Sequence, residues 1–219
     1  MNLSFNVGDD PQNIIENRKR FFESVGIPDN SLAIPRQVHG DTVRRVTEPG
    51  RFESCDALLT NVKEIFLAVS TADCVPIFLV DPITKSLAAV HSGWRGSKLS
   101  ILSKTVIALQ NEFGTKVENL VAYIGPSAAV CCYEVGEEVA KEFDEKYLQK
   151  NQGRKAHLDL KQFNKNLLLE AGVHEKNIEV SPHCTICNPE LFHSYRRDKE
   201  KSGRMMGVIG LACLTYGGL

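Results

Sequence analysis

Three of the His and Cys residues, the side chains that zinc prefers, each follow a short apolar segment. They are His39 in the sequence RQVHG, Cys74 in TADC and His91 in AAVHSGWRG. A catalytic zinc site commonly has three protein ligands and an open position for water or substrate, and two His with one Cys is a known set. The three residues therefore predict one zinc site and small-molecule chemistry at it.

The spacing of these residues also permits a purely structural interpretation. No CxxC or HExxH pattern places them on one element. An isolated His after a strand is often a hydrogen-bonded structural residue, and a Cys is often a small buried side chain. The segment after His91 favours a site, because Gly93 and Gly96 permit backbone turns and Trp94 and Arg95 can line a pocket.

A second group of thiols lies elsewhere in the chain. Cys184 and Cys187 form a CxxC next to His183, and Cys131 and Cys132 are adjacent to each other. A separate structural zinc or a redox pair is one interpretation. A single CxxC is incomplete as a zinc ribbon, however, and no βαβ pattern supports a thioredoxin-like motif. We expect thiols that are buried or on loops near the rim of the pocket.

The elements that must position the three candidate ligands are apolar strands. Residues 65–70, 75–80 and 86–90 are continuous apolar runs, which are typical of strands covered on both faces. They predict the centre of the sheet, with Cys74 and His91 at strand ends, where loops usually hold catalytic groups. Residues 31–46 predict two strands that are joined by an irregular bend.

Further helices and strands are predicted around this centre. One helix follows Asp10 and Pro11 and ends at Gly26, and another begins with Ser97 as its cap and ends at Gly114. The other predicted elements are strands at 119–125, 178–181 and 206–214, a charged surface helix at 134–150 and a helix at 160–172. No repeat or linker divides them, so we expect a single α+β domain of layered mixed sheets flanked by helices.

Composition excludes several classes of partner. Of the 219 residues, 42% are hydrophobic and 24% are charged, the formal net charge is -1 and the pI is about 6.6. The chain therefore has a sizeable core and no basic field for nucleic acid or an anionic membrane. Without a membrane-spanning run or a secretory leader, a cytoplasmic protein is expected. Seven cysteines in a large chain indicate reduced thiols rather than a disulfide framework.

Six sequence blocks in order resemble one known family. They are QVHG, CDALLTN, TADCVPIFLVD, AAVHSGWRG, IGPSAAVCCYEVG and HSYRRDKEKSGRMM. The series is similar to that of the multicopper-polyphenol-oxidase or laccase-like family, now regarded as zinc-dependent purine nucleoside enzymes, and it covers nearly the whole chain. The resemblance implies a sandwich of the cytotoxic-necrotizing-factor-like cysteine hydrolase type, and it places the family's metal ligands on His39, Cys74 and His91.

The same resemblance implies the activity and the partners. It indicates phosphorolysis of adenosine, inosine, guanosine and methylthioadenosine, together with deamination of adenosine. The partners are then a purine nucleoside and phosphate, and both reactions can use one Zn²⁺, because zinc makes water more acidic. The protein is expected to be a monomer or a homodimer.

The chemistry of individual side chains suggests roles for them in these reactions. Asp73 is the candidate for proton transfer or for orienting a ligand, beside Cys74 and His91 as catalytic residues; a turn residue that binds nearby backbone amides is an equal interpretation of Asp73. For phosphate or ribose the candidates are Arg95 and then Arg196 or Arg197, because a guanidinium pairs two oxygens at once.

Three other functions are compatible with the sequence. A hydrolase that edits peptidoglycan precursors, which part of the family resembles, would use Cys74 and His91 as nucleophile and base. A non-catalytic zinc-binding or partner-binding domain is another. Copper polyphenol oxidation is more distant, because the three methionines, at positions 1, 205 and 206, are far from the three ligands in sequence.

The start of the sequence differs from the family pattern. Members usually begin with a further strand and a Ser-Thr-Arg-x-Gly-Gly segment before the block that resembles NLSFNVGDD, whereas residues 1–219 begin at that later block. We expect a single laccase-like domain without the usual N-terminal segment. An uncovered sheet edge would then favour a dimer or a non-catalytic role.

Overall fold

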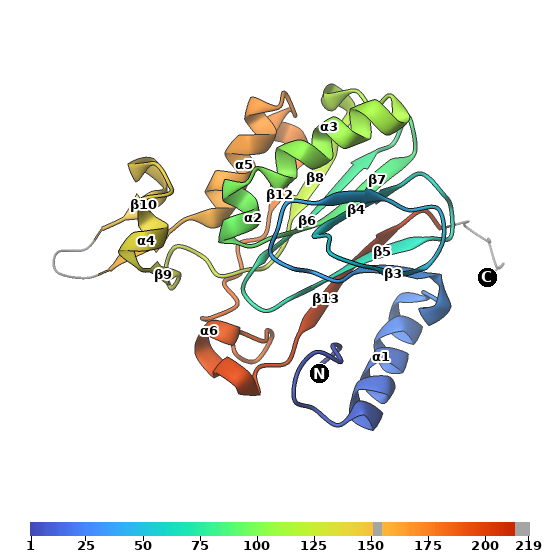
Figure 1. Cartoon of the computed structure of the whole chain (residues 1–219), viewed down its shortest axis with the longest axis horizontal. Helices are drawn as coiled ribbons and strands as arrows, with labels where there is room; N and C mark the ends of the chain where they lie inside the picture. Colours follow the sequence, from blue (N-terminus) through green and yellow to red (C-terminus); the bar gives the residue numbers. More distant parts are fainter. Residues whose placement is uncertain (151–154, 213–219) are drawn as a thin grey trace.

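The computed structural model describes residues 1–150 and 155–212 (Figure 1). Its helices are α1 Pro11–Val25, α2 Trp94–Lys98, α3 Ile101–Phe113, α4 Glu137–Ala140, α5 Leu160–Glu170 and α6 Tyr195–Asp198. Its strands are β1 Leu32–Pro35, β2 Val43–Arg45, β3 Gly50–Phe52, β4 Ala57–Thr60, β5 Phe66–Thr71, β6 Val75–Asp81, β7 Ser86–Ser92, β8 Val121–Ile124, β9 Glu134–Val135, β10 Leu148–Gln149, β11 Ala156–Leu158, β12 Ile178–Val180 and β13 Met205–Gly210.

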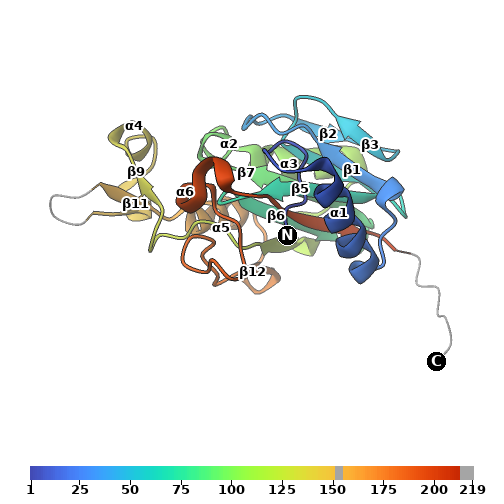
Figure 2. The same cartoon turned by 90° about the horizontal axis from the view of Figure 1, so that it is seen from below.

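The main body has four layers. Helices α2, α3 and α5 cover one face of a six-stranded sheet, whose other face packs on a four-stranded sheet, and α1 covers the far side of that second sheet (Figure 1). A small sheet with the order β10-β11-β9 projects from one end together with α4 (Figure 2). The predicted α+β class with layered mixed sheets describes this arrangement.

The six-stranded sheet positions the candidate site. Its strand order is β12-β8-β6-β7-β4-β2, with β6 antiparallel to both β7 and β8. Every residue of β7 is buried, because helices cover one face and the second sheet covers the other. The same burial explains the continuous apolar sequence of this strand, since a strand with two buried faces does not alternate apolar with polar residues.

The four-stranded sheet has the order β13-β5-β1-β3 and joins distant parts of the chain. Strand β1 is parallel to β3 and β5, while β13, from the end of the described chain, is antiparallel to β5. Phe22 of α1 packs on this sheet with Phe66 and Ala68. The helix has the predicted ends: the side chain of Asp10 accepts from the backbone N–H of Gln12, and Gly26 is left-handed with φ 66°.

Some local predictions were wrong. The charged segment 134–150 is not one helix but β9, α4, a turn of 3-10 helix and β10, since Gly136 and Asp144 are both extended. The helix predicted from Ser97 is divided into α2 and α3, because Ser100 is left-handed with φ 62°. The predicted centre is shared between two sheets, with β5 in the four-stranded sheet and β6 and β7 in the other.

Most of the other predicted elements are present with ends shifted by a few residues. They include both strands of 31–46, the strands near 119–125 and 178–181, and the helix near 160–172. The strand predicted at 206–214 ends at Gly210, and its last two residues lie outside the described part of the chain. Among the described residues, no helix has the length and apolar character needed to cross a membrane.

Candidate active site

The three predicted metal ligands meet where β6 begins and β7 ends. His39 lies in the bend between β1 and β2, Cys74 directly precedes β6, and His91 lies in β7. One ligand atom from each lies within 4.8 Å of the other two, and the rings of His39 and His91 meet edge to face with centroids 4.9 Å apart. Cys74 and His91 approach each other because the antiparallel register pairs Val75 with Ser92.

Asp56, which was not predicted from the sequence, holds two of these ligands in place. Its Oδ1 lies 2.8 Å from Nδ1 of His91, and both groups are buried. The same carboxylate accepts the backbone N–H groups of Val38, His39 and Gly40 at 2.8–3.1 Å. A carboxylate on Nδ1 fixes the tautomer of an imidazole and leaves Nε2 for a metal, so Asp56 is a positioning residue.

Cys74 and His91 each favour the charged form of the other. Burial opposes the charge on each group, yet the positive charge of His91 and hydrogen bonds from both histidines lower the pKa of Cys74 to about 6. Likewise, the charge of Cys74 and the hydrogen bond to Asp56 overcome burial and raise the pKa of His91 to about 9. Cys74 is therefore ionised at neutral pH, which is the form that binds metals and attacks electrophiles.

Gly93 leaves the space in which the sulfur and a ring sit. A Cβ at this position would lie 3.1 Å from Sγ of Cys74 and 3.3 Å from Cδ2 of His39, and one at Gly96 would lie 2.8 Å from the carbonyl oxygen of Gly40. The backbone at Gly93 is extended with φ −77°. The two glycines are thus needed for close approach, and not for the backbone turns that the sequence analysis inferred.

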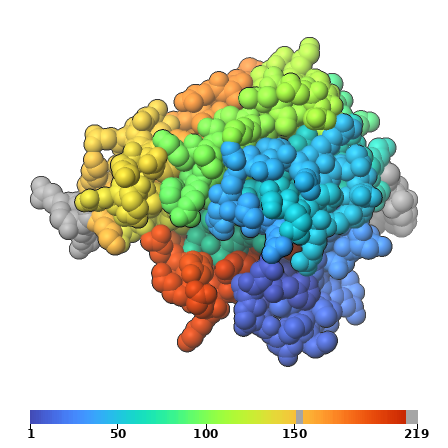
Figure 3. Space-filling model, in the orientation of Figure 1, coloured from blue at the N-terminus to red at the C-terminus, as the bar shows by residue number. Residues whose placement is uncertain are grey.

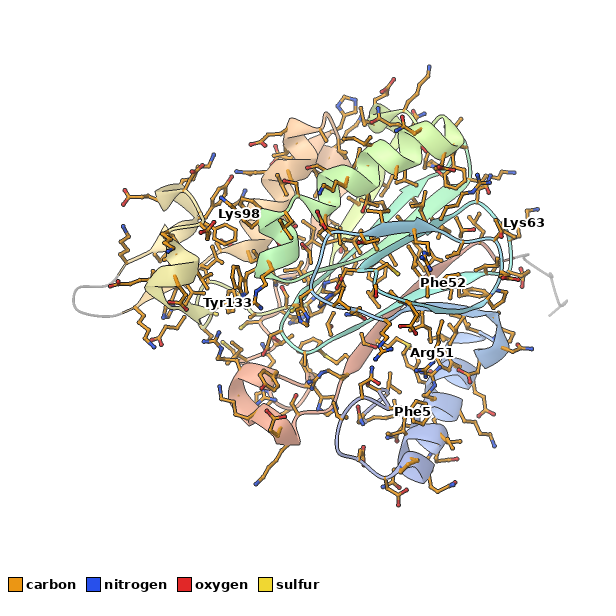
Figure 4. All side chains as sticks on the ribbon, in the orientation of Figure 1. Phe5, Arg51, Phe52, Lys63, Lys98 and Tyr133 are labelled. Atoms are coloured by element: carbon orange, nitrogen blue, oxygen red, sulfur yellow. The ribbon has the colours of Figure 1, made fainter. Side chains whose placement is uncertain are left out.

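The three ligands lie in the wall of a cavity of about 710 Å³, a size typical of small-molecule sites. Five arginines and three aromatic residues also line it, namely Arg18, Arg36, Arg51, Arg196, Arg204, Phe5, Tyr133 and Tyr195. Figure 4 shows Phe5 and Arg51 on one side and Tyr133 on the other. The N-terminal segment and the region of α6 lie side by side along this face (Figure 3), joined by the bond from Leu3 N–H to the carbonyl of Arg204.

Asp73 lies beside Cys74 and lines the same cavity. Its carboxylate accepts hydrogen bonds from the hydroxyls of Thr185 (2.6 Å) and Ser194 (3.0 Å) and from the backbone N–H of Arg196 (2.6 Å). Its backbone is left-handed with φ 90°, a conformation that is uncommon for a residue with a side chain. Asp73 therefore ties the Cys74 turn to the C-terminal segment.

The three candidate arginines lie in different surroundings. Arg196 lines the cavity, with its guanidinium 5.4 Å from the ring of Tyr133. Arg95 is exposed and stacks on Trp94 at 4.5 Å. All five N–H groups of Arg197 are already used, by the carboxylate of Asp198 and the carbonyl oxygens of Thr185, Ile186 and Phe192.

Of the three arginines, only Arg196 is among the described residues that line the cavity. One predicted anion-binding residue therefore lies at the site, and Arg95 and Arg197 do not. Arg36, Arg51 and Arg204 were not selected from the sequence, although Arg36 stands in RQVHG and Arg204 in the block HSYRRDKEKSGRMM. Arg51 lies in none of the quoted motifs. Asp56 did have a signal, since it stands in the CDALLTN block immediately before a buried strand.

Residues 1–212 match the family model described as multi-copper polyphenol oxidoreductase laccase. The chain belongs to this family. The purine nucleoside phosphorylase YlmD of Bacillus subtilis is 33% identical over 96% of this chain and 82% of its own length. The purine nucleoside phosphorylase of Deinococcus radiodurans is 39% identical over 93% of this chain and 79% of its own. A protein named adenosine deaminase RL5, from an unknown prokaryotic organism, is 35% identical over 93% and 84%.

Solved structures of the laccase-like family agree with the fold. YlmD from Geobacillus stearothermophilus superposes with a TM-score of 0.92 and 32% identity, covering 97% of this chain and 85% of that one. The hypothetical protein YfiH of Bacillus licheniformis gives a TM-score of 0.91 at 32% identity, covering 96% and 85%. The predicted family and the predicted α+β fold class are therefore confirmed.

The donor set of this family member suits a metal ion. One thiolate and two imidazoles are the ligands that borderline divalent metals prefer, and the missing Cβ of Gly93 leaves room beside two of them. Met206 lines the same cavity, although it is far from the three ligands in sequence. Three ligands within 4.8 Å, open to a cavity, leave a position for a further ligand.

Proposed function

We propose that this chain is a zinc-dependent purine nucleoside phosphorylase that also deaminates adenosine. The observation that carries the proposal is the meeting of His39, Cys74 and His91 in one wall of an arginine-lined cavity. The names of its relatives, which include both purine nucleoside phosphorylases and an adenosine deaminase, support it. The proposed substrates are adenosine, inosine, guanosine and methylthioadenosine, with phosphate as the second reactant, and one domain does both reactions.

The cavity has the charge and the surfaces that these substrates need. Among the described residues, five arginines line it with only three carboxylates, those of Glu53, Asp73 and Glu200, and the excess of positive charge favours an anion such as phosphate. Arg196 is the first candidate for that contact. Tyr133 offers an aromatic face, and burial raises the pKa of its hydroxyl, which therefore stays protonated as a donor.

In the proposed reactions the arginines, the aromatic residues and the three metal ligands have different tasks. In phosphorolysis an oxygen of phosphate attacks C1′ of the ribose, and the bond from C1′ to the purine nitrogen breaks. The arginines hold the phosphate near C1′, while the aromatic residues hold the base. His39, Cys74 and His91 would hold the zinc ion, and Asp56 fixes the ring of His91. When bound, the metal supplies a Lewis acid and makes water acidic enough for deamination at C6.

The test uses the full chain loaded with zinc. Incubation with adenosine and phosphate should produce adenine with ribose 1-phosphate, and inosine with ammonia, which chromatography separates. The same preparation of Cys74→Ser should produce neither pair. Absence of all four products from the wild-type protein would contradict the proposal, and zinc binding without turnover would indicate a binding domain. Oxidation of a phenol by the copper-loaded protein would instead support an oxidase.

The ion pair between Cys74 and His91 favours a second candidate. A thiolate with a pKa of about 6 next to an imidazolium is the arrangement of a cysteine hydrolase. In that case metal-free protein would cleave an amide in a peptidoglycan precursor. Cys74→Ala would abolish this cleavage, whereas a chelator would leave it unchanged. Inhibition by the chelator would return the assignment to the metal-dependent enzyme.

A further inference from the structure

Four cysteines that are outside the active site converge into one cluster. The sulfur atoms of Cys131, Cys132, Cys184 and Cys187 all lie within 4.8 Å of one another. Two of the separations are 2.9 Å, from Cys132 to Cys187, and 3.5 Å, from Cys131 to Cys187. In a tetrahedral zinc site with Zn–S bonds of about 2.3 Å, neighbouring sulfurs are roughly 3.8 Å apart. The separations in the cluster, from 2.9 Å up to at most 4.8 Å, lie on both sides of this value.

The cluster joins two segments that are distant in sequence. Cys131 and Cys132 lie in the turn between β8 and β9, and Cys184 and Cys187 lie in the loop between β12 and α6. The loops meet through a parallel bridge between Ser127 and Cys184. A CxxC from one loop and an adjacent pair from another give four thiolate ligands, the set of closed structural zinc sites.

The surroundings of the buried sulfur favour a metal rather than neutral thiols. The backbone N–H of Ala129 donates to Sγ of Cys184 at 3.4 Å. A main-chain N–H directed at a sulfur stabilises its thiolate form. A divalent cation is what would stabilise four thiolates this close together.

We propose that Cys131, Cys132, Cys184 and Cys187 bind a second Zn²⁺ ion in a closed, structural site. Its place in the fold suggests what it stabilises. Tyr133, next to the cysteine pair, lines the cavity, and Thr185, inside the CxxC, donates to the carboxylate of Asp73. The ion would hold together the two loops that form this wall of the active site. The proposal is independent of the proposed function, because it concerns different ligands and no reaction.

The alternative is a disulfide between Cys132 and Cys187, whose sulfurs are the closest pair. It would leave Cys131 and Cys184 without a role, although both converge on the same point. A disulfide and a zinc site also differ in a measurable way. Zinc-bound thiolates react with a thiol reagent after denaturation without any reductant, whereas a disulfide does not.

The decisive experiment measures zinc per chain in the full-length protein by elemental analysis. We expect about two zinc ions in the wild type and about one in the double variant Cys184→Ser/Cys187→Ser. Cys74→Ser should also hold about one, but at the cluster. The control Cys55→Ala removes a buried cysteine outside both groups and should keep about two. Equal zinc in the wild type and the double variant, or iron in place of zinc, would overturn the proposal.

A second measurement applies if the double variant does not fold. The variant His39→Ala lacks one ligand of the active site and keeps all four cysteines of the cluster. After exchange of zinc for cobalt, its absorption should show the intense charge-transfer bands of a tetrahedral tetrathiolate site. Mass spectrometry of the alkylated, non-reduced protein should find no bond between Cys132 and Cys187. Weak cobalt bands, or that disulfide as the main species, would refute the zinc site whether or not any nucleoside is turned over.

Discussion

The two clusters of soft ligands in this molecule are built in opposite ways. Cys74 and His91 are positioned by β6 and β7 of the six-stranded sheet, and His39 by the bend between β1 and β2. All three open into a cavity of about 710 Å³. The four-cysteine cluster lies on two loops, and its four sulfur atoms converge within 4.8 Å of one another. A site with three ligands and an open side is suited to catalysis, and a site with four thiolates is suited to stability. The comparison indicates that the position of a thiol in the fold, more than its presence, decides its role.

The support of the two clusters differs in the same sense. In the active site a buried carboxylate, Asp56, orients His91 and three backbone amides of the His39 bend. In the cluster, backbone N–H groups around Cys184 donate hydrogen bonds directly to its sulfur. The catalytic ligands therefore depend on another side chain, which substitution can remove, whereas the cluster depends on the path of the main chain.

The largest expected effect separates the functions of the clusters. Cys74→Ser should lower kcat/KM for adenosine phosphorolysis by about 10³-fold or more, because a metal ligand contributes several kcal/mol to transition-state stabilisation. Cys187→Ser should instead lower the free energy of unfolding by at least about 2 kcal/mol, because binding energy of a structural metal is folding energy. Steady-state kinetics and urea denaturation measure the two. If each variant lost both properties equally, the comparison would fail.

The next effect tests the carboxylate that supports the open site. Asp56→Asn keeps the size of the side chain but removes its charge, so the ring of His91 loses its orienting partner. We expect a 10- to 100-fold loss in metal affinity or activity, the range usual for such partners. Competition with a chromophoric chelator gives the metal affinity. Asp41→Asn, at a half-buried carboxylate paired with Lys104, is the matched control and should change neither quantity.

A smaller effect is expected from filling the space beside the ligands. In Gly93→Ala the new Cβ meets Sγ of Cys74 and the ring of His39, and an overpacked site shifts by a few tenths of an ångström. We expect metal affinity to fall about tenfold while stability falls by about 1–3 kcal/mol. Gly8→Ala, where a Cβ would meet nothing within 4 Å, should leave metal affinity unchanged. Unchanged metal affinity in Gly93→Ala would show that the close approach is unimportant.

The smallest expected effect distinguishes two adjacent arginines. Arg196→Lys should raise the KM for phosphate several-fold, roughly 3- to 10-fold, with little change in the melting temperature, because a lysine keeps the charge but loses the planar fork. Arg197→Lys should instead lower the melting temperature with little change in the KM for phosphate. Its guanidinium N–H groups are bound within the fold, and several part-buried carbonyl oxygens would lose their donors. Phosphate titration and thermal denaturation of both variants measure this. A raised KM only in Arg197→Lys would reassign the contact.

Much of the fold was predictable because its strongest signals are local. The capped ends of α1 and the continuous apolar runs of β6 and β7 are visible in the sequence and present in the structure. Segment 134–150 was mispredicted because its charged residues suit a helix surface, while the packing of β9 against β11 requires an extended chain. The division between two sheets was not visible either, since burial on both faces looks the same in either sheet.

The sequence by itself determined the residue types of the active site and, through six ordered blocks, the family. His39, Cys74 and His91 each end or follow an apolar segment, and this local property survives folding. Only the tertiary structure decided that Asp56 orients His91, that Arg197 is bound within the fold, and that four cysteines from two loops converge. The physical reason is that these contacts join segments distant in the chain, and their geometry depends on how the sheets and loops pack.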